Sequence, residues 1–220
     1  MNKADLHIHS KYSPDSKSSL ENIIKKAKSE NIKIIALSDH NTVEGSKEAR
    51  RLTKNDEDLL VIPSIEISSK EGHILGVGCE ESIKRDLTAQ ETIDFIHSQG
   101  GLAIIPHPYC FYRHGLLCEV NPDDLKIDGI ETKNARYIIG YCNRKAKKLA
   151  IKNNYPTLGA SDAHYYKFVG DCYTEINCEM DIDSVLKAIK KGNVEACGGG
   201  TSNIKLSKYL FDYRILKKYD

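Results

Sequence analysis

The sequence has almost no excess of either charge and no long apolar run. Its 32 basic and 31 acidic residues leave a net charge of +1, so composition gives no general reason to expect a polyanionic partner. No apolar stretch approaches the roughly 20 residues that a membrane-spanning helix needs. The chain also enters a strand-like segment almost at once, which leaves no room for a signal peptide. We therefore expect a cytoplasmic protein that does not bind a membrane, and any preference for nucleic acid must come from a local site.

The chain also lacks a paired-cysteine motif. Its seven cysteines are an odd number without a C-x-x-C pair, and several of them, such as Cys79 and Cys197, lie in apolar surroundings. We expect buried free thiols in a reducing compartment, with disulfides or a zinc–thiolate site as the alternative. Cys110 is of particular interest, because it follows His107 closely and could approach a functional site.

No linker rich in serine, glycine or proline and no internal repeat divides the 220 residues. Strand and helix signals alternate instead, and Thr88 and Glu91 form a capping box at the start of one predicted helix. This order favours a single α/β domain over 1–203 whose parallel strands close into a barrel. A tail over 204–220, with apolar residues at near-helical spacing, is expected to be helical and to dock on that domain rather than recruit a partner.

The predicted elements follow from apolar periodicity and from capping and turn residues. Strands are predicted at 3–9, 32–38, 59–68, 73–78, 102–106, 129–132, 157–161 and 172–176. Helices are predicted at 20–30, 43–54, 88–100, 138–153 and 182–191.

Side chains that bind metals recur where these predicted strands end. His7 and His9 close the first strand, and because strand side chains alternate, both imidazoles face the same side and could chelate one divalent ion. Strand ends of a barrel meet at one rim, where the chemistry of such folds is found. Six of the eight histidines belong to this set, which chance placement hardly explains. Its nine members are His7, His9, Asp15, His40, Glu66, His73, His107, Asp162 and His164.

The order of these motifs closely resembles that of the PHP (polymerase and histidinol phosphatase) superfamily of metal-dependent phosphoesterases. The resemblance implies a distorted (β/α)7 TIM-like barrel, the PHP fold, over roughly the whole chain. The matching segments are D-L-H-I-H-S at 5–10, S-D-H-N-T at 38–42, I-E-I-S at 65–68, G-H-I-L-G at 72–76, H-P at 107–108 and S-D-A-H at 161–164.

The resemblance further implies a trinuclear centre that holds two to three divalent metal ions. Imidazole and carboxylate ligands suit Mn, Zn or Fe, so ligand type alone does not select the metal. Glu66, Asp162 and His164 are the residues it implies in catalysis. The first metal would take His7, His9, Glu66 and Asp162, the second would share Glu66 and add His73 and His107, and the third would take Asp15, His40 and His164.

Charge supports phosphate chemistry at such a centre. Three divalent ions would bring about +6 and the three carboxylates about −3, which leaves about +3 for a dianionic phosphate. Arg113, His114 and Arg136 lie in loops similar to those that carry phosphate ligands in relatives, and arginine binds phosphate through two parallel hydrogen bonds. A solvated surface position is the alternative for the two arginines.

Three further residues allow more than one interpretation. Asp5 and Asp39 neighbour predicted ligands, and carboxylates often orient metal-bound imidazoles. Plain capping of the strand ends is the alternative for both. His97 lies in the middle of a predicted helix and is expected to be structural.

The complete set of ligands favours a phosphoesterase that acts on a small phosphorylated substrate. A nucleotide or the end of a short oligonucleotide is favoured, because Asp15, where some family members have histidine, resembles the nucleotide-directed branch. No stable protein partner is predicted. A histidinol-phosphate phosphatase is the alternative among enzymes, and a catalytically idle, metal-stabilised binding domain is the alternative from another class. A degenerate domain should lose ligands, whereas here all nine positions are filled.

Overall fold

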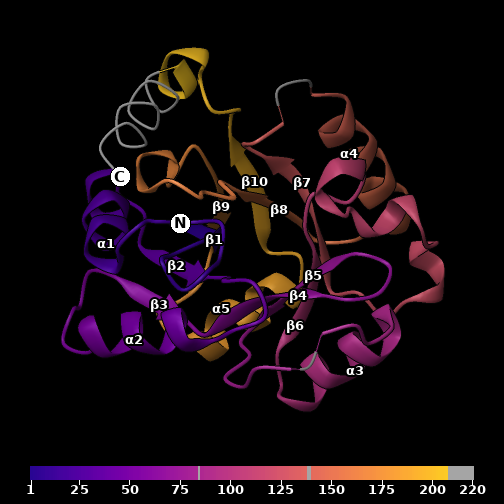
Figure 1. Cartoon of the computed structure of the whole chain (residues 1–220), viewed down its shortest axis with the longest axis horizontal. Helices are drawn as coiled ribbons and strands as arrows, with labels where there is room; N and C mark the ends of the chain where they lie inside the picture. Colours follow the sequence, from indigo (N-terminus) through magenta and orange to yellow (C-terminus); the bar gives the residue numbers. More distant parts are fainter. Residues whose placement is uncertain (84, 138–139, 208–220) are drawn as a thin grey trace.

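The structure, a computed structural model, describes residues 1–83, 85–137 and 140–207. In this part of the chain the strands form two five-stranded sheets (Figure 1). The first sheet has the strand order β10-β9-β1-β2-β3, and the second has the order β4-β5-β6-β7-β8. The strands are β1 Asn2–Ile8, β2 Ile34–Leu37, β3 Leu60–Ile62, β4 Ser64–Ser68, β5 His73–Val77, β6 Leu102–Ile105, β7 Gly129–Asn134, β8 Thr157–Ala160, β9 Cys172–Ile176 and β10 Val194–Gly198.

Helices alternate with the strands, as the sequence predicts. Three of them begin at side-chain caps: Ser19 accepts a hydrogen bond from the Asn22 N–H, Asp181 accepts one from the Ser184 N–H, and Thr88 and Glu91 form the predicted capping box. The α-helices of the described residues are α1 Leu20–Ser29, α2 Glu44–Leu52, α3 Ala89–Ser98, α4 Tyr141–Asn153 and α5 Ile182–Lys190. Short 3₁₀ turns are η1 Phe111–Arg113, η2 Leu116–Cys118, η3 Pro122–Asp124 and η4 Tyr166–Phe168.

Both sheets are mixed rather than purely parallel. Strand β1 pairs in parallel with β2, and β6, β7 and β8 pair in parallel, but β4–β5, β5–β6, β1–β9 and β9–β10 are antiparallel. The single strand predicted over 59–68 is wrong, because it is divided at Pro63 into β3 and β4, which lie in different sheets. Proline has no N–H to donate to a ladder, so the chain leaves one sheet and joins the other there.

The two sheets meet at the ends of their strands. Isolated bridges join Ile8 to Ala163 and His40 to Glu66, and the His9 N–H donates to the Ala163 carbonyl at 2.9 Å. The prediction of a single α/β domain is confirmed, but the prediction that its strands are all parallel is wrong. The described strands, however, form two ladders joined by single bridges rather than one continuous closed barrel, so a regular seven-stranded barrel is not confirmed.

One apolar cluster is shared by the two sheets beneath this rim. Leu6 and Ile34 from the first sheet pack with Leu75, Ile104 and Leu158 from the second, and all five are buried. Full burial of each such side chain contributes about 1.5–3 kcal/mol. This shared core fixes the strand ends of both sheets relative to each other, and so provides a rigid base for the side chains at the rim.

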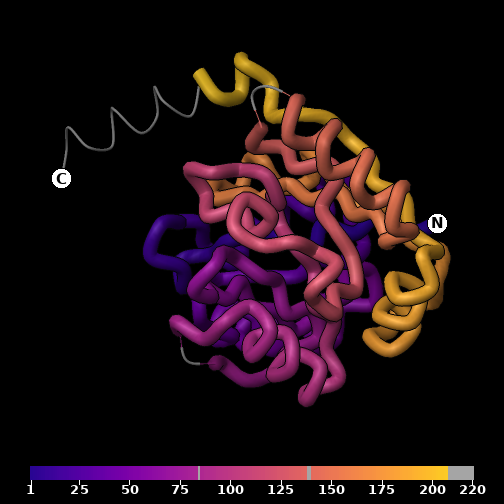
Figure 2. The backbone as a smooth tube through the Cα atoms, turned by 90° about the vertical axis from the view of Figure 1, so that its right-hand side faces the viewer, coloured from indigo at the N-terminus to yellow at the C-terminus, as the bar shows by residue number. Residues whose placement is uncertain are grey.

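The last part of the chain lies along one side of the molecule, as the orange and yellow segments of Figure 2 show. Strand β10 was not predicted, because Val194–Gly198 is half-exposed and shows neither a buried run nor clean alternation. Residues 203–207 are helical, but most of the predicted tail falls at 208–220, outside the described residues, so its docking stays a prediction. No helix of the described residues is both long and apolar enough to cross a membrane.

Candidate metal centre

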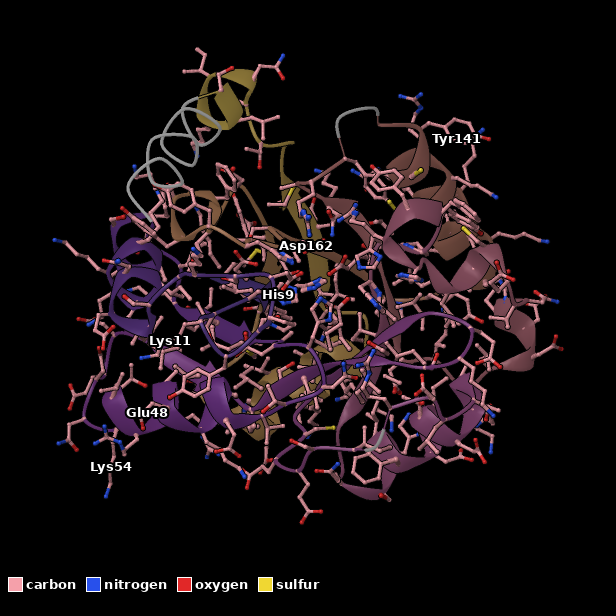
Figure 3. The ribbon with its side chains drawn as sticks, viewed as in Figure 1. His9, Lys11, Glu48, Lys54, Tyr141 and Asp162 are labelled. Carbon is pink, nitrogen blue, oxygen red and sulfur yellow. The ribbon has the colours of Figure 1, made fainter. Side chains whose placement is uncertain are left out.

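All nine predicted metal ligands lie together where the two sheets meet. Figure 3 shows two of them, His9 and Asp162, near the middle of the view, whereas Glu48, Lys54 and Tyr141 lie toward its edge. His7, His9, Glu66, His107 and Asp162 are buried, and the other four are at least partly exposed. The donor atoms form three sets: an inner set of His7, His9, Glu66 and Asp162, a middle set of Glu66, His73 and His107, and an outer set of Asp15, His40 and His164.

The inner set has the spacing of ligands around one ion. Two donors bound about 2.1 Å from the same ion lie roughly 3.0–3.6 Å apart. The two Nε2 atoms of His7 and His9 are 3.0 Å apart and lie 3.4 and 3.3 Å from Oε2 of Glu66. Both also lie near Oδ1 of Asp162, at 3.7 and 3.6 Å. The two imidazoles therefore lie at metal-ligand spacing from each other and from both carboxylates, as the first predicted metal requires.

The Glu66 carboxylate faces two sets at once. Its Oε2 atom faces the inner set, and its Oε1 atom lies 3.0 Å from Nδ1 of His73 and 3.1 Å from Nε2 of His107. With each oxygen directed at a different set of imidazoles, the carboxylate has the geometry to bridge two metal ions. This is the arrangement that the family resemblance implies for Glu66.

The outer set is centred on Asp15. Its Oδ2 atom lies 2.7 Å from Nε2 of His164 and 3.3 Å from Nε2 of His40. The expected ligand sets gave His9 and His40 to one metal each, but His9 also approaches this set, and Nδ1 of His40 lies 3.3 Å from Oε2 of Glu66. The outer and inner sets are therefore contiguous, and His9 and His40 lie between them.

The protonation states favour metal binding at most of these donors. Burial would raise the pKa of Glu66, but the charges of His73 and His7 hold it well below its usual range. Burial and the charge of His164 lower the pKa of His9 to about 3, so its imidazole is neutral. Burial opposes the charge on His7 as well, but Asp162 and Glu131 raise its pKa well above the usual value. Ligation of His7 would therefore release a proton.

Glu131, on β7, orients the inner set from behind and was not predicted as a site residue. Its Oε1 atom lies 2.7 Å from Nδ1 of His7, and its Oε2 atom accepts from the His107 N–H at 2.9 Å and from Nδ2 of Asn134 at 2.9 Å. Asn134 Nδ2 also donates to Asp162 Oδ2 at 3.1 Å. A carboxylate on Nδ1 leaves Nε2 of His7 for the metal. The only sequence feature that could have pointed to Glu131 was the presence of an acidic residue inside a predicted buried strand.

Asp5 and Asp39 cap strand ends and contact no imidazole in the hydrogen bonds of the described residues. Asp39 accepts from the N–H and the hydroxyl of Ser10 at 2.6 and 2.7 Å. Asp5 accepts from the N–H groups of Ser161 and Gly170 at 3.0 and 2.9 Å, and burial raises its pKa to about 6. The capping interpretation is therefore the right one, and the orienting role belongs to Glu131.

The backbone at two of the buried ligands adopts a sparsely populated conformation. His107 has φ +30° and Asp162 has φ +51°, each directly or closely after the end of a strand. Such a conformation is unfavourable for residues other than glycine, and where the surrounding structure imposes it, a functional role is a common reason. In this conformation His107 lies beside Glu66, and Asp162 lies beside His7 and His9.

The three candidate phosphate ligands differ in exposure. Arg113 is mostly buried and donates to Asp162, to Asn134 Oδ1 at 3.2 Å and to Sγ of Cys110 at 3.2 Å. Arg136 is more exposed, at 39%, and donates to Asp162 Oδ1 at 3.2 Å and to the His164 ring. His114 is exposed beside His73, with ring centroids 5.4 Å apart. Neither arginine is a freely solvated surface side chain, because both contact Asp162.

The remaining sequence expectations concern residues around the centre. All seven cysteines are free thiols, and Cys79, Cys110 and Cys172 are buried. Cys110 approaches the centre through its Sγ contact with Arg113 and through its N–H, which donates to the His107 carbonyl at 3.0 Å. His97 is structural, because its Nε2 lies 2.7 Å from Asp128 and joins α3 to the segment before β7.

The chain is similar to several known proteins. A family model described as PHP-associated matches residues 140–194. The uncharacterized protein MJ1587 of Methanocaldococcus jannaschii is 42% identical over 163 residues, which cover 68% of this chain and 92% of that protein.

Solved structures share the fold at low identity. A two-domain protein of Bacteroides vulgatus that contains a predicted PHP-like metal-dependent phosphoesterase superposes with a TM-score of 0.75, at 17% identity, over 90% of this chain and 65% of that chain. The lesion-specific endonuclease PfuEndoQ of Pyrococcus furiosus superposes with a TM-score of 0.65, at 19% identity, over 89% of this chain and 57% of that chain. This chain therefore spans less than two thirds of either structure, and the likeness concerns the fold.

Proposed function

The chain belongs to the PHP superfamily, and on that premise we propose that it is a metal-dependent phosphoesterase that hydrolyses a small phosphorylated substrate. The observation that carries the proposal is the Glu66 carboxylate, whose two oxygens face two different groups of imidazoles. A catalytically idle domain would not need so complete a set of donors. The favoured substrate is a nucleotide or the end of a short oligonucleotide.

The donors fit two or three divalent ions such as Mn, Zn or Fe. Metal ions held there would lower the pKa of a water and neutralise charge on the phosphate. The chain's own residues set the geometry for this chemistry. Glu66 would link the inner and middle sets, Asp162 would complete the inner set, and His164 with Asp15 and His40 would form the outer one. Asn134 and Glu131 hold these donors in place.

Phosphate would be bound at the exposed side of the centre. Arg136 is the side chain best placed for it, because its guanidinium is partly exposed and already lies beside His164 and Asp162. His114 is the second candidate, on the side of His73. Arg113 faces inward on Asp162, so its main role would be to hold that carboxylate, with its unpaired Nη2 atom available for a phosphate oxygen.

A substrate screen tests the proposal directly. Protein purified without chelator and reconstituted with Mn, Zn or Fe should hydrolyse at least one member of a panel of nucleotides, short oligonucleotides, sugar phosphates and histidinol phosphate. Elemental analysis of the same samples should show more than one metal equivalent per chain. Fully loaded protein that hydrolyses none of them would support the idle domain, and faster turnover of histidinol phosphate would support that phosphatase instead.

A further inference from the structure

A cavity of about 420 Å³ opens beside the outer set of the metal centre. Arg136, Asp162 and His164 form its inner end, so the cavity begins where the phosphate is expected to bind. Its far wall is the last described segment, residues 200–206, which follows β10 and appears in yellow at the top of Figure 1. The cavity thus leads from the candidate metal centre to a part of the chain that supplies none of the nine ligands.

Away from this inner end, the described residues that line the cavity are uncharged. Tyr165, Phe168 and Leu206 provide aromatic and apolar surface. Hydroxyl and amide groups come from Thr201, Ser202 and Asn203. Among the lining residues, charge is confined to Arg136 and Asp162 at the metal centre. A group that occupies the cavity would therefore meet flat apolar surface and neutral hydrogen-bonding groups.

The segment that forms the far wall is tied to the domain. Asp171, in the turn before β9, accepts from the Thr201 hydroxyl at 2.9 Å and forms an ion pair with Lys205. The Thr201 N–H donates to the Ala135 carbonyl at 2.9 Å, at the end of β7. The wall is therefore held on both sides of the cavity, by the end of β7 and by the turn before β9.

We propose that this cavity binds the alcohol part of the substrate, and that this part is an uncharged heteroaromatic group such as a nucleoside. The inference rests on the proposed phosphoesterase function and narrows the range of substrates proposed for it. A continuing oligonucleotide would place a second phosphate where the described lining residues carry no cation, and an amino alcohol would need a carboxylate there. Aromatic surface with neutral donors and acceptors suits a base and a ribose, and the volume lies in the usual range of about 300–1,000 Å³ for ligand pockets.

Substrates that share the phosphomonoester but differ in the alcohol test this proposal. With the Mn-loaded protein, adenosine 5′-monophosphate should have a kcat/KM at least about tenfold above that of glycerol 3-phosphate. Adenosine alone should bind the same protein in a calorimetric titration, because the cavity recognises the alcohol without the phosphate.

Two neighbouring glycines provide a variant and its control. A Cβ at Gly200 would lie 3.5 Å from the Tyr137 carbonyl oxygen and 3.7 Å from that of Ala135, so Gly200→Leu places its bulk against the cavity wall. A Cβ at Gly199 meets nothing within 4 Å, and Gly199 does not line the cavity. Gly200→Leu should raise KM for the nucleotide at least about tenfold more than for glycerol 3-phosphate and should abolish adenosine binding, whereas Gly199→Leu should preserve both.

The outcomes separate this inference from the proposed function. If no phosphoester is hydrolysed but adenosine binds and Gly200→Leu prevents it, the phosphoesterase proposal fails and the cavity assignment stands. If the enzyme hydrolyses phosphoesters but adenosine does not bind, or Gly200→Leu affects both substrates equally, the cavity assignment is overturned. A dinucleotide turned over faster than the mononucleotide would overturn it as well. Asn203→Trp, which adds bulk at another lining position, should reproduce the Gly200→Leu result.

Discussion

The inner and outer sets of the metal centre contain the same types of ligand but differ in their surroundings. His7 and Glu66 of the inner set are 0% and 1% exposed, and Glu131 orients His7 from behind. Asp15 of the outer set is 46% exposed and lies in a loop, where the Ser13 hydroxyl donates to it at 2.8 Å. The inner set is thus preorganised and shielded from water, whereas the outer set of the same centre is open to solvent. Metal should be held tightly in the first and exchange more readily in the second.

The largest loss of activity is expected from removing the charge of Glu66, the carboxylate that the inner and middle sets share. Glu66→Gln keeps the shape but gives up the charge and one good acceptor, so kcat/KM should fall at least about 1,000-fold, roughly 4 kcal/mol of transition-state stabilisation. Elemental analysis should show loss of metal from the inner and middle sets together. Glu57→Gln, at an exposed carboxylate, is the control. Normal turnover of Glu66→Gln would contradict the bridging role.

The stability of the protein should depend on pH through the buried Asp5 carboxyl next to the inner set. Asp5 lies in β1, two residues before His7, and burial raises its pKa from 3.8 to about 6. A raised pKa means that the folded state binds the proton of Asp5 more tightly than the unfolded state does. The protonated carboxyl therefore stabilises the fold below about pH 4, and this contribution to the free energy of unfolding is lost as the pH rises through 6. The shift corresponds to about 3 kcal/mol. Because the lowered pKa of His9 contributes a slope of opposite sign in both proteins, the test is the difference between wild type and Asp5→Asn in urea unfolding of the chelated protein. The stability of wild type relative to the variant should fall by this amount between pH 4 and 7, and a constant difference would refute the assignment.

Loss of the Glu131 carboxylate, which orients His7, should have an intermediate effect on metal affinity. Glu131→Gln leaves every direct ligand in place but weakens the contacts to His7 and the His107 N–H, so metal affinity of the inner set should drop about 10- to 100-fold. Competition with a fluorescent chelator measures this. Asp39→Asn serves as the comparison, because Asp39 is buried but contacts Ser10 rather than an imidazole. If both variants weakened metal binding alike, orientation by Glu131 would not be the cause.

The smallest effect on metal affinity is expected from a substitution in the outer set. Asp15→Asn removes one charge from a solvent-screened site, so the affinity for the outer metal should fall about fivefold, on the order of 1 kcal/mol. The inner metals should remain at wild-type occupancy in elemental analysis after dialysis. Simultaneous loss of all metals from Asp15→Asn would show that the sets are not separable, and the comparison between them would fail.

Most of the nine candidate ligands could be predicted because they stand in short local motifs at the end of an apolar run, whereas Asp15 and His73 were included because the family resemblance implies them. His7 and His9 needed only the alternation of a strand, and the helix after Thr88 needed only its capping box. Glu131 could not be assigned in this way, because its partner His7 lies 124 positions away, and only the pairing of strands brings them together. For the same reason, the division of the sheets at Pro63 and the antiparallel pairs of β5 were missed, since local periodicity does not encode which strands are neighbours.

The cavity beside the outer set was also beyond prediction from sequence. Its walls combine the end of β7, the turn that contains η4 and the segment after β10, which meet only in the folded chain. Asp171, which fixes that segment, has no sequence motif that distinguishes it from other surface carboxylates. Arg136 was predicted as a candidate phosphate ligand from its position after a predicted strand, and the structure adds that it lines the cavity and contacts Asp162.

The junction of the two sheets links metal supply to the lifetime of the protein. His7 lies in β1 and His9 directly follows it, whereas Glu66 lies in β4 and Asp162 follows β8, so an ion bound by these residues would connect the two sheets. An ion present at about 100 times its dissociation constant would add roughly 2.7 kcal/mol to the free energy of unfolding. Metal starvation would then expose the chain to proteolysis, so that its abundance, and not only its turnover number, would follow the metal status of the cell.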